Sequence, residues 1–282
     1  MPECPTCSRP YEPAEGPRCP NCQTFIGYPN VRRANLPEQV AALDARYEAA
    51  RADAAVRGAG ATLAAFESAL SASQAVVNVG LPFLLALMTS EQPYATYREQ
   101  VAAGTRAPAK GDWDRERAAV DAFLFGTYDK DIRYAALTLS STGLTSYGEF
   151  SLILVERQIA ERASLLDENA FDFVARHRLV VRDPIPLGYL ASWPNRAKLA
   201  VAKLAGEVEE TTSVSDFARL LLNGAGDRAT DRFVEVHIFG GFGRYAVASV
   251  HGSSVGLSKR ERAKLMAVKD FLASTGGTWI ES

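Results

Sequence analysis

The sequence lacks a hydrophobic run long enough to cross a membrane. Its most apolar stretch, Val76–Met88, is interrupted by Asn78, Gly80 and Pro82, whereas a membrane-spanning helix needs about 20 consecutive apolar residues. The first residues also lack the charged and apolar regions of a secretory signal. We therefore expect a cytoplasmic protein without a membrane partner.

An excess of charge of either sign is also absent. The 282 residues include 31 Lys and Arg against 33 Asp and Glu, a net charge of −2. This balance gives no general electrostatic attraction to nucleic acid or to a membrane surface. With 47% hydrophobic residues, the composition is that of a globular protein with a substantial core.

Cysteine is absent beyond residue 22. The four cysteines, Cys4, Cys7, Cys19 and Cys22, form two CxxC pairs separated by eleven residues. A tight turn lets each pair direct two thiolates at one ion, so two pairs complete a tetrahedron. In a reducing compartment, clustered cysteines bind metal more often than they form disulfides. We predict a zinc ribbon over residues 1–30 that holds one structural Zn²⁺; the alternatives are iron in the same geometry and two redox pairs.

The segment after the ribbon predicts a connector built of helices. Residues 28–37 are typical of a linker, and from Glu38 onward Val40, Leu43 and Tyr47 recur at helical spacing. The segment 82–88 has the composition of a buried helix. We therefore expect a helical connector over residues 36–92.

The remaining chain, residues 93–282, predicts an α+β domain. Strand patterns and helix patterns follow one another without regular βαβ alternation. Ser258 and Glu261 form a capping-box pattern that begins a helix near the C-terminus. Strands are expected at residues 133–139, 147–155, 232–239, 245–250 and 278–280, and helices at residues 113–125, 195–208 and 213–222.

The most informative strand is the one expected at residues 232–239. Alternate side chains of a strand share a face, which places Val234, Val236 and Ile238 toward the core. The other face then carries Phe233, Glu235, His237 and Phe239. Glu235 and His237 are about 7 Å apart along such a strand. A carboxylate and an imidazole flanked by aromatic rings can form the wall of a catalytic cleft; the alternative is an ordinary solvent-facing strand side.

Six short segments occur in one order that resembles a bacterial family of unknown function. Members of that family contain the motifs YRSQF, LFGGAY, RYGALNL, FGS and EAQVHG. The matching segments here are Tyr97–Gln100, Asp114–Arg117, Leu124–Tyr128, Arg133–Leu137, Tyr147–Phe150 and Phe233–His237. The family's polar loop is replaced here by Ala103–Ala107, its FGS serine by Glu149 and its second His by Phe239. The family in turn looks like ADP-ribosyltransferase toxins, whose split antiparallel β fold binds NAD in a cleft.

This resemblance implies a role for each site residue. Arg133 would hold the pyrophosphate or the nicotinamide ribose of NAD, and Tyr134 or Tyr147 would stack on nicotinamide. Glu235, with His237 beside it, would contact the ribose 2′-hydroxyl and stabilise an oxocarbenium-like transition state. The implied protein is a toxin or phage-defence transferase that modifies a protein or a nucleic acid. The alternative is a non-enzymatic zinc-ribbon docking protein whose cleft is inactive.

Overall fold

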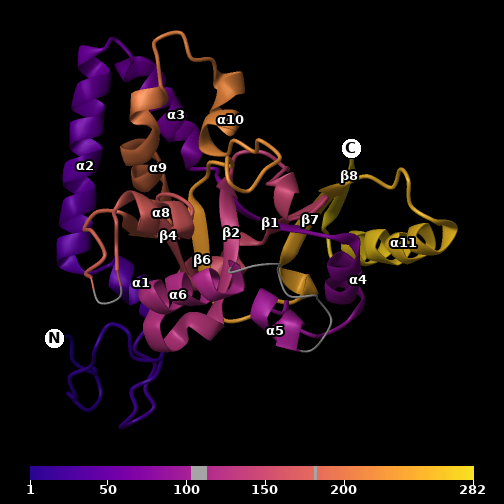
Figure 1. Cartoon of the computed structure of the whole chain (residues 1–282), viewed down its shortest axis with the longest axis horizontal. Helices are drawn as coiled ribbons and strands as arrows, with labels where there is room; N and C mark the ends of the chain where they lie inside the picture. The colour runs from indigo at the N-terminus through magenta and orange to yellow at the C-terminus, as the bar shows by residue number, and fades with distance from the viewer. Residues whose placement is uncertain (103–112, 181–182) are drawn as a thin grey trace.

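The computed structural model describes residues 1–102, 113–180 and 183–282, and within these ranges eight strands form one sheet (Figure 1). The strand order is β5-β4-β6-β2-β1-β3-β7-β8. Neighbouring strands are antiparallel except for β7 and β8, which are parallel. The α+β class is confirmed. The resemblance implied a split sheet, whereas the eight strands form one sheet. The strands are β1 (Gln74–Val79), β2 (Ile132–Thr138), β3 (Phe150–Leu154), β4 (Ala163–Leu166), β5 (Leu190–Ser192), β6 (Glu235–Phe239), β7 (Val247–Gly252) and β8 (Thr278–Glu281).

Helices pack on both faces of this sheet (Figure 1). A large hydrophobic cluster on one face joins the sheet to α2, α3 and α9, and also to α4 and α11. On the opposite face, α1, α6 and α8 lie over β2, β4, β5 and β6. These helices are α1 (Pro29–Ala34), α2 (Pro37–Val56), α3 (Gly60–Leu70), α4 (Leu81–Thr89), α6 (Trp113–Phe125), α8 (Ala170–Arg176), α9 (Arg196–Leu204) and α11 (Lys259–Ser274). The shorter helices are α5 (Tyr97–Ala102), α7 (Glu156–Ile159) and α10 (Phe217–Leu221).

The expected helical connector over residues 36–92 requires correction, because it contains a central strand. β1 lies between β2 and β3 and is hydrogen-bonded to both. Val76, Val77 and Val79 are buried, and such β-branched side chains suit a strand that is covered on both faces. The helices of this segment also share one core with the strands that follow. Residues 36–92 are therefore part of the main body.

The expected linker over residues 28–37 is also different in the structure. Residues 29–34 form α1, which begins at Pro29 as the first helical residue. Its residues Pro29, Asn30 and Ala34 are buried against the body. The ribbon is thus joined to the sheet by a packed helix, and in Figure 1 it lies beyond that helix at the lower left.

The capping box at Ser258 is confirmed at the start of α11. The Ser258 hydroxyl accepts from the backbone N–H of Glu261, and the Glu261 carboxylate accepts from the backbone N–H of Ser258. Within the described ranges, no helix combines the length and the apolar character that crossing a membrane requires.

Gly148 allows a close approach of two backbones, and this predicts a stability effect. A Cβ atom at Gly148 would lie 2.5 Å from the carbonyl oxygen of Val79. We expect Gly148→Ala to lower the free energy of unfolding by about 1–3 kcal/mol, measured by urea denaturation. Gly206→Ala is the matched control, because its Cβ would meet nothing within 4 Å. Equal stability of the two variants would contradict this description of the Gly148 turn.

Candidate functional site

The N-terminal cysteines converge on one point. Their four Sγ atoms all lie within 4.8 Å of one another. Cys4 and Cys22 are 3.4 Å apart at sulfur, and Cys7 and Cys19 are 3.6 Å apart. A tetrahedral site with Zn–S bonds of about 2.3 Å has S···S edges of about 3.8 Å. The four thiols therefore fit one metal ion.

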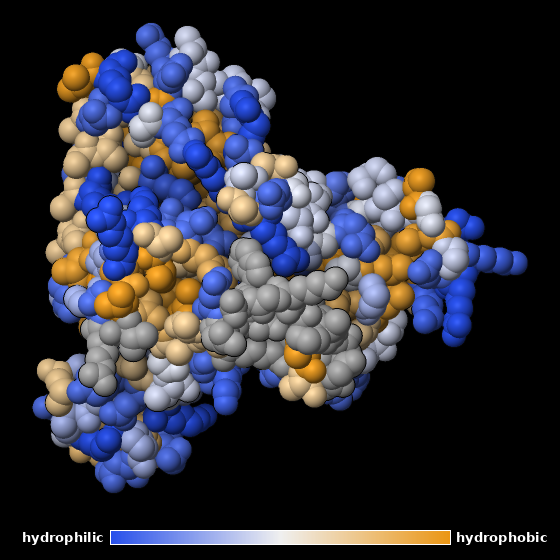
Figure 2. Space-filling model, in the orientation of Figure 1, coloured by the Kyte–Doolittle hydropathy of each residue, from blue (hydrophilic) through white to orange (hydrophobic). Residues whose placement is uncertain are grey.

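The two cysteine turns repeat the same backbone geometry. The carbonyl of Cys4 accepts from the N–H of Ser8, and the carbonyl of Cys19 accepts from the N–H of Gln23. Ser8 and Gln23 have φ values of 55° and 59°, in the left-handed region. This repetition explains how two short segments present their thiols in matching positions. Hydrophilic residues cover much of this segment in the view of Figure 2.

Glu235 and His237 form a buried pair on β6. Glu235 Oε1 and His237 Nε2 are 2.7 Å apart. Glu235 is 6% exposed and His237 is 1% exposed. The structure thus places both side chains on one covered face, not on an open strand side. β6 lies between β2 and β4, so the pair is held on both flanks by the sheet.

The aromatic rings around His237 come from other elements than we expected. The rings of Phe125, on α6, and Tyr134, on β2, meet the imidazole edge to face at 4.8 and 5.4 Å between centroids. Phe233 instead contacts Tyr147, and Phe239 contacts Tyr28 and Tyr128. The register explains the position of Tyr134, because it pairs directly with His237 across β2 and β6.

Arg117 on α6 supplies a cation to this face. Its guanidinium lies 4.4 Å from the centroid of the Tyr134 ring and 3.9 Å from a carboxylate oxygen of Asp121. The Tyr134 hydroxyl donates to Asp121 at 2.5 Å. Burial acts to lower the pKa of Arg117, but Tyr134, Asp121 and Glu235 together raise it above its ordinary value. Burial, and next the charge of Asp121, raise the pKa of Tyr134 well above its ordinary range.

Tyr147 is half-buried and lies within electrostatic range of Glu235. Burial, and next the negative charge of Glu235, raise the pKa of Tyr147 to about 12. Its hydroxyl accepts from the Asn169 amide at 3.4 Å, and the Arg228 guanidinium lies 4.7 Å from its ring centroid. The arrangement presents a neutral phenol ring beside a carboxylate, which suits the stacking of a flat ligand.

Arg133 does not join this group. It follows the strand alternation and pairs with Ile238, so it points to the opposite face from Tyr134 and His237. Its guanidinium donates to the carbonyl of Lys130 at 2.9 Å and forms an ion pair with Glu99 at 3.1 Å. Arg133 therefore does not lie beside Glu235, and this position does not support the cofactor-binding role predicted for it.

Sequence reasoning missed Arg117 and Asp121. Their spacing of four residues on an expected helix was a usable signal, because such residues are neighbours on one helix face. The substituted Glu149 has a structural position: its carboxylate accepts from the N–H of Leu81 at 2.9 Å, at the start of α4. The substituted loop Ala103–Ala107 lies outside the described residues.

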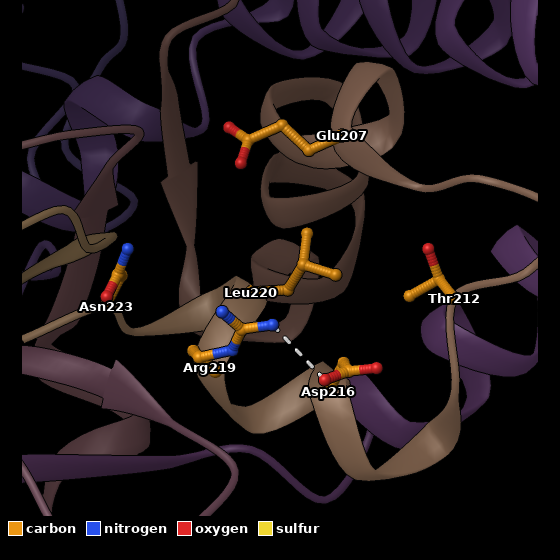
Figure 3. Close-up of a pocket in the computed structure, with 6 residues that line it drawn as sticks. All are labelled: Glu207, Thr212, Asp216, Arg219, Leu220 and Asn223. Atoms are coloured by element: carbon orange, nitrogen blue, oxygen red, sulfur yellow. Dashed lines mark hydrogen bonds and ion pairs between the residues drawn. The ribbon is translucent and has the colours of Figure 1, made fainter.

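A surface hollow of ≈ 240 Å³ lies elsewhere, beside α9 and α10 (Figure 3). It contains none of the predicted site residues. Asp216 and Arg219 form an ion pair of 3.3 Å at its edge. Its lining residues are Glu207, Thr212, Asp216, Arg219, Leu220 and Asn223.

Comparison with models of known protein families and with curated proteins gave no match for this chain.

Proposed function

We propose that the protein is an NAD-dependent ADP-ribosyltransferase that modifies a macromolecule, either protein or nucleic acid. The observation that carries this proposal is the pair on β6. The Glu235 carboxylate is held by a buried imidazole, Tyr134 packs on that imidazole, and the charge of Glu235 acts on Tyr147 and Arg117. Such preorganised charge stabilises the positive charge that develops at an anomeric carbon. The proposed biological setting is that of a toxin or phage-defence effector.

Each residue on this face has a separate role in the proposed reaction. Nicotinamide stacks on Tyr147, and the Glu235 oxygen that does not contact His237 receives the ribose 2′-hydroxyl. The bond between C1′ and the nicotinamide nitrogen breaks, and nicotinamide leaves with the bonding electrons. A nucleophilic atom of the target forms the new bond at C1′ and releases its proton to water. Arg117 offsets the negative charge of Asp121 and Glu235 throughout.

We also propose that the ribbon holds one structural Zn²⁺ on its four thiolates. Such a site has no open coordination position, so the metal stabilises the fold and takes no part in catalysis. The ribbon then acts as a positioning device for the macromolecular target. Its attachment through α1 supports this function, because Arg32 donates to the carbonyl of Pro13 at 3.1 Å and also to the carbonyls of Glu15 and Gly27.

One observation favours the alternative of a docking protein without activity. Glu235 is only 6% exposed. A site that binds no substrate does not need a more accessible carboxylate. In that case the ribbon and the helices bind a partner protein, and NAD is not consumed.

Labelled NAD distinguishes the two functions. The purified protein is incubated with cell lysate and NAD that carries a radiolabel on its adenylate phosphate. We expect acid-precipitable label in one fraction, removed either by protease or by nuclease. A parallel reaction with NAD labelled only on nicotinamide is the control and should leave the label soluble. Label in neither fraction would favour the docking function.

A further inference from the structure

A small cavity lies behind the imidazole of His237, between α1 and the sheet. Its volume is ≈ 10 Å³, which is the space for about one water molecule. Three of its lining residues, Asn30, Tyr128 and His237, are between 1% and 3% exposed. Each of them has one buried polar atom that lacks a hydrogen-bond partner within the described ranges: Asn30 Oδ1, the Tyr128 hydroxyl and His237 Nδ1. Buried polar atoms without partners are rare and require an explanation.

The orientation of the Asn30 amide is fixed by its neighbours. Its Nδ2 lies 3.0 Å from the carbonyl oxygen of Arg162, 3.0 Å from that of His237 and 3.1 Å from Ser164 Oγ. Two carbonyl oxygens accept and cannot donate, so the nitrogen must be on this side. The amide oxygen is therefore the atom left over, and it can only accept.

The three atoms match the bonding capacity of one water molecule. A water that donates to Asn30 Oδ1 has one proton left for His237 Nδ1 and can accept from the Tyr128 hydroxyl. Every proton then has an acceptor. If His237 Nδ1 carried a proton instead, Nδ1 and the Tyr128 hydroxyl would both donate to the water. The water would donate to Asn30 Oδ1, and its second proton would have no acceptor among these three atoms. Arg33 lines the same cavity, and its interaction with the Tyr128 hydroxyl opposes the increase in pKa that burial causes there.

We propose that this cavity is a binding site for one structural water, which connects His237 Nδ1 to Asn30 and Tyr128 and holds His237 as the neutral tautomer protonated at Nε2. His237 is then a positioning residue: its Nε2–H donates to Glu235 Oε1 and fixes the carboxylate rotamer. We call this series of hydrogen bonds, from Asn30 and Tyr128 through the water and His237 to Glu235, the relay. Its role in catalysis rests on the proposed function. A neutral His237 leaves the full negative charge of Glu235 for the developing cation.

The relay also gives α1 a function beyond linkage. Asn30 directs its amide into the body, while Arg32 of the same short helix donates to carbonyls of the ribbon. Asn30 is separated from His237 by 207 residues in sequence, yet it contacts both the backbone of His237 and the cavity beside its ring. The helix that holds the ribbon therefore also completes the surroundings of the candidate catalytic pair.

Nitrogen NMR of the full chain with labelled histidine tests the tautomer directly. The chain has three histidines, so comparison with His237→Gln assigns the signal. Near neutral pH we expect a protonated Nε2 and an unprotonated Nδ1. A protonated Nδ1, as the other tautomer or as imidazolium, would overturn the proposal. This readout needs no NAD, so failure of the relay and failure of the proposed function are separate results.

Tyr128→Phe removes the hydroxyl and keeps the ring. We expect it to shift the Nδ1 signal of His237 and to lower kcat for nicotinamide release roughly 10-fold at unchanged KM. Tyr245→Phe is the matched control, because Tyr245 is 58% exposed and should alter neither quantity. An unchanged Nδ1 signal in Tyr128→Phe would overturn the connection through water.

Discussion

Glu235→Gln is expected to lower the rate of nicotinamide release from NAD by about 10²–10³-fold. The amide keeps the size of the side chain and can still accept from His237 Nε2, so the local geometry remains. What is lost is the negative charge that stabilises the oxocarbenium-like transition state. Nicotinamide formed in single-turnover reactions, quantified by chromatography, gives the rate, and thermal unfolding verifies the fold.

A distant carboxylate provides the control for this experiment. Glu161 is exposed, and Glu161→Gln should turn over NAD like the unmodified chain. If Glu235→Gln and Glu161→Gln have equal rates, Glu235 has no part in the mechanism. If Glu235→Gln also unfolds at a much lower temperature, Glu235→Asp gives a second test, because it keeps the charge and withdraws it by one methylene group.

Cys19→Ser is expected to abolish metal binding by the ribbon. Cys19 is fully buried, and a hydroxyl does not replace a thiolate in a closed four-sulfur site. Since structural zinc contributes on the order of 10 kcal/mol of apparent binding free energy, the ribbon should lose its fold with the metal. Elemental analysis of the purified chain should give one zinc for the native protein and none for the variant. Residues 1–27 of the variant should become sensitive to protease.

Glu12→Gln is the matched control within the ribbon. Glu12 is exposed between the two cysteine pairs, and its variant should retain the metal. Full zinc content in Cys19→Ser would contradict the four-thiolate site. Iron in place of zinc would preserve the geometry and change the metal assignment, and its visible absorption would reveal it at once.

The sequence predicted the strands whose pattern is strong. β2, β3, β6 and β7 have recognisable patterns, and they lie within a few residues of the expected ranges. β1 was missed because it is buried on both faces, so its residues show no alternation. β4 and β5 contain only four and three residues, too few for a period to appear.

The sequence predicted which site residues share one strand, but it did not predict which residues of other elements lie next to them. Glu235 and His237 were found because two residues on one strand share a face. Arg133 was misplaced because the face of a residue on β2 relative to β6 depends on strand register, which composition does not contain. Arg117 belongs to a helix that packs over the sheet, so only tertiary structure brings it to the pair. Asn30 and His237 are even further apart in the sequence, and no pattern of neighbouring residues indicates that they are in contact.

Calorimetric titration of NAD into the full chain shows whether NAD binds on the face of β6. We expect saturable binding at one site per chain. Tyr147→Ala should weaken this binding roughly 10-fold or more because it removes the stacking surface, whereas Tyr245→Ala should bind like the native protein. Absence of binding, or equal binding by the native chain and Tyr147→Ala, would show that NAD does not bind on this face.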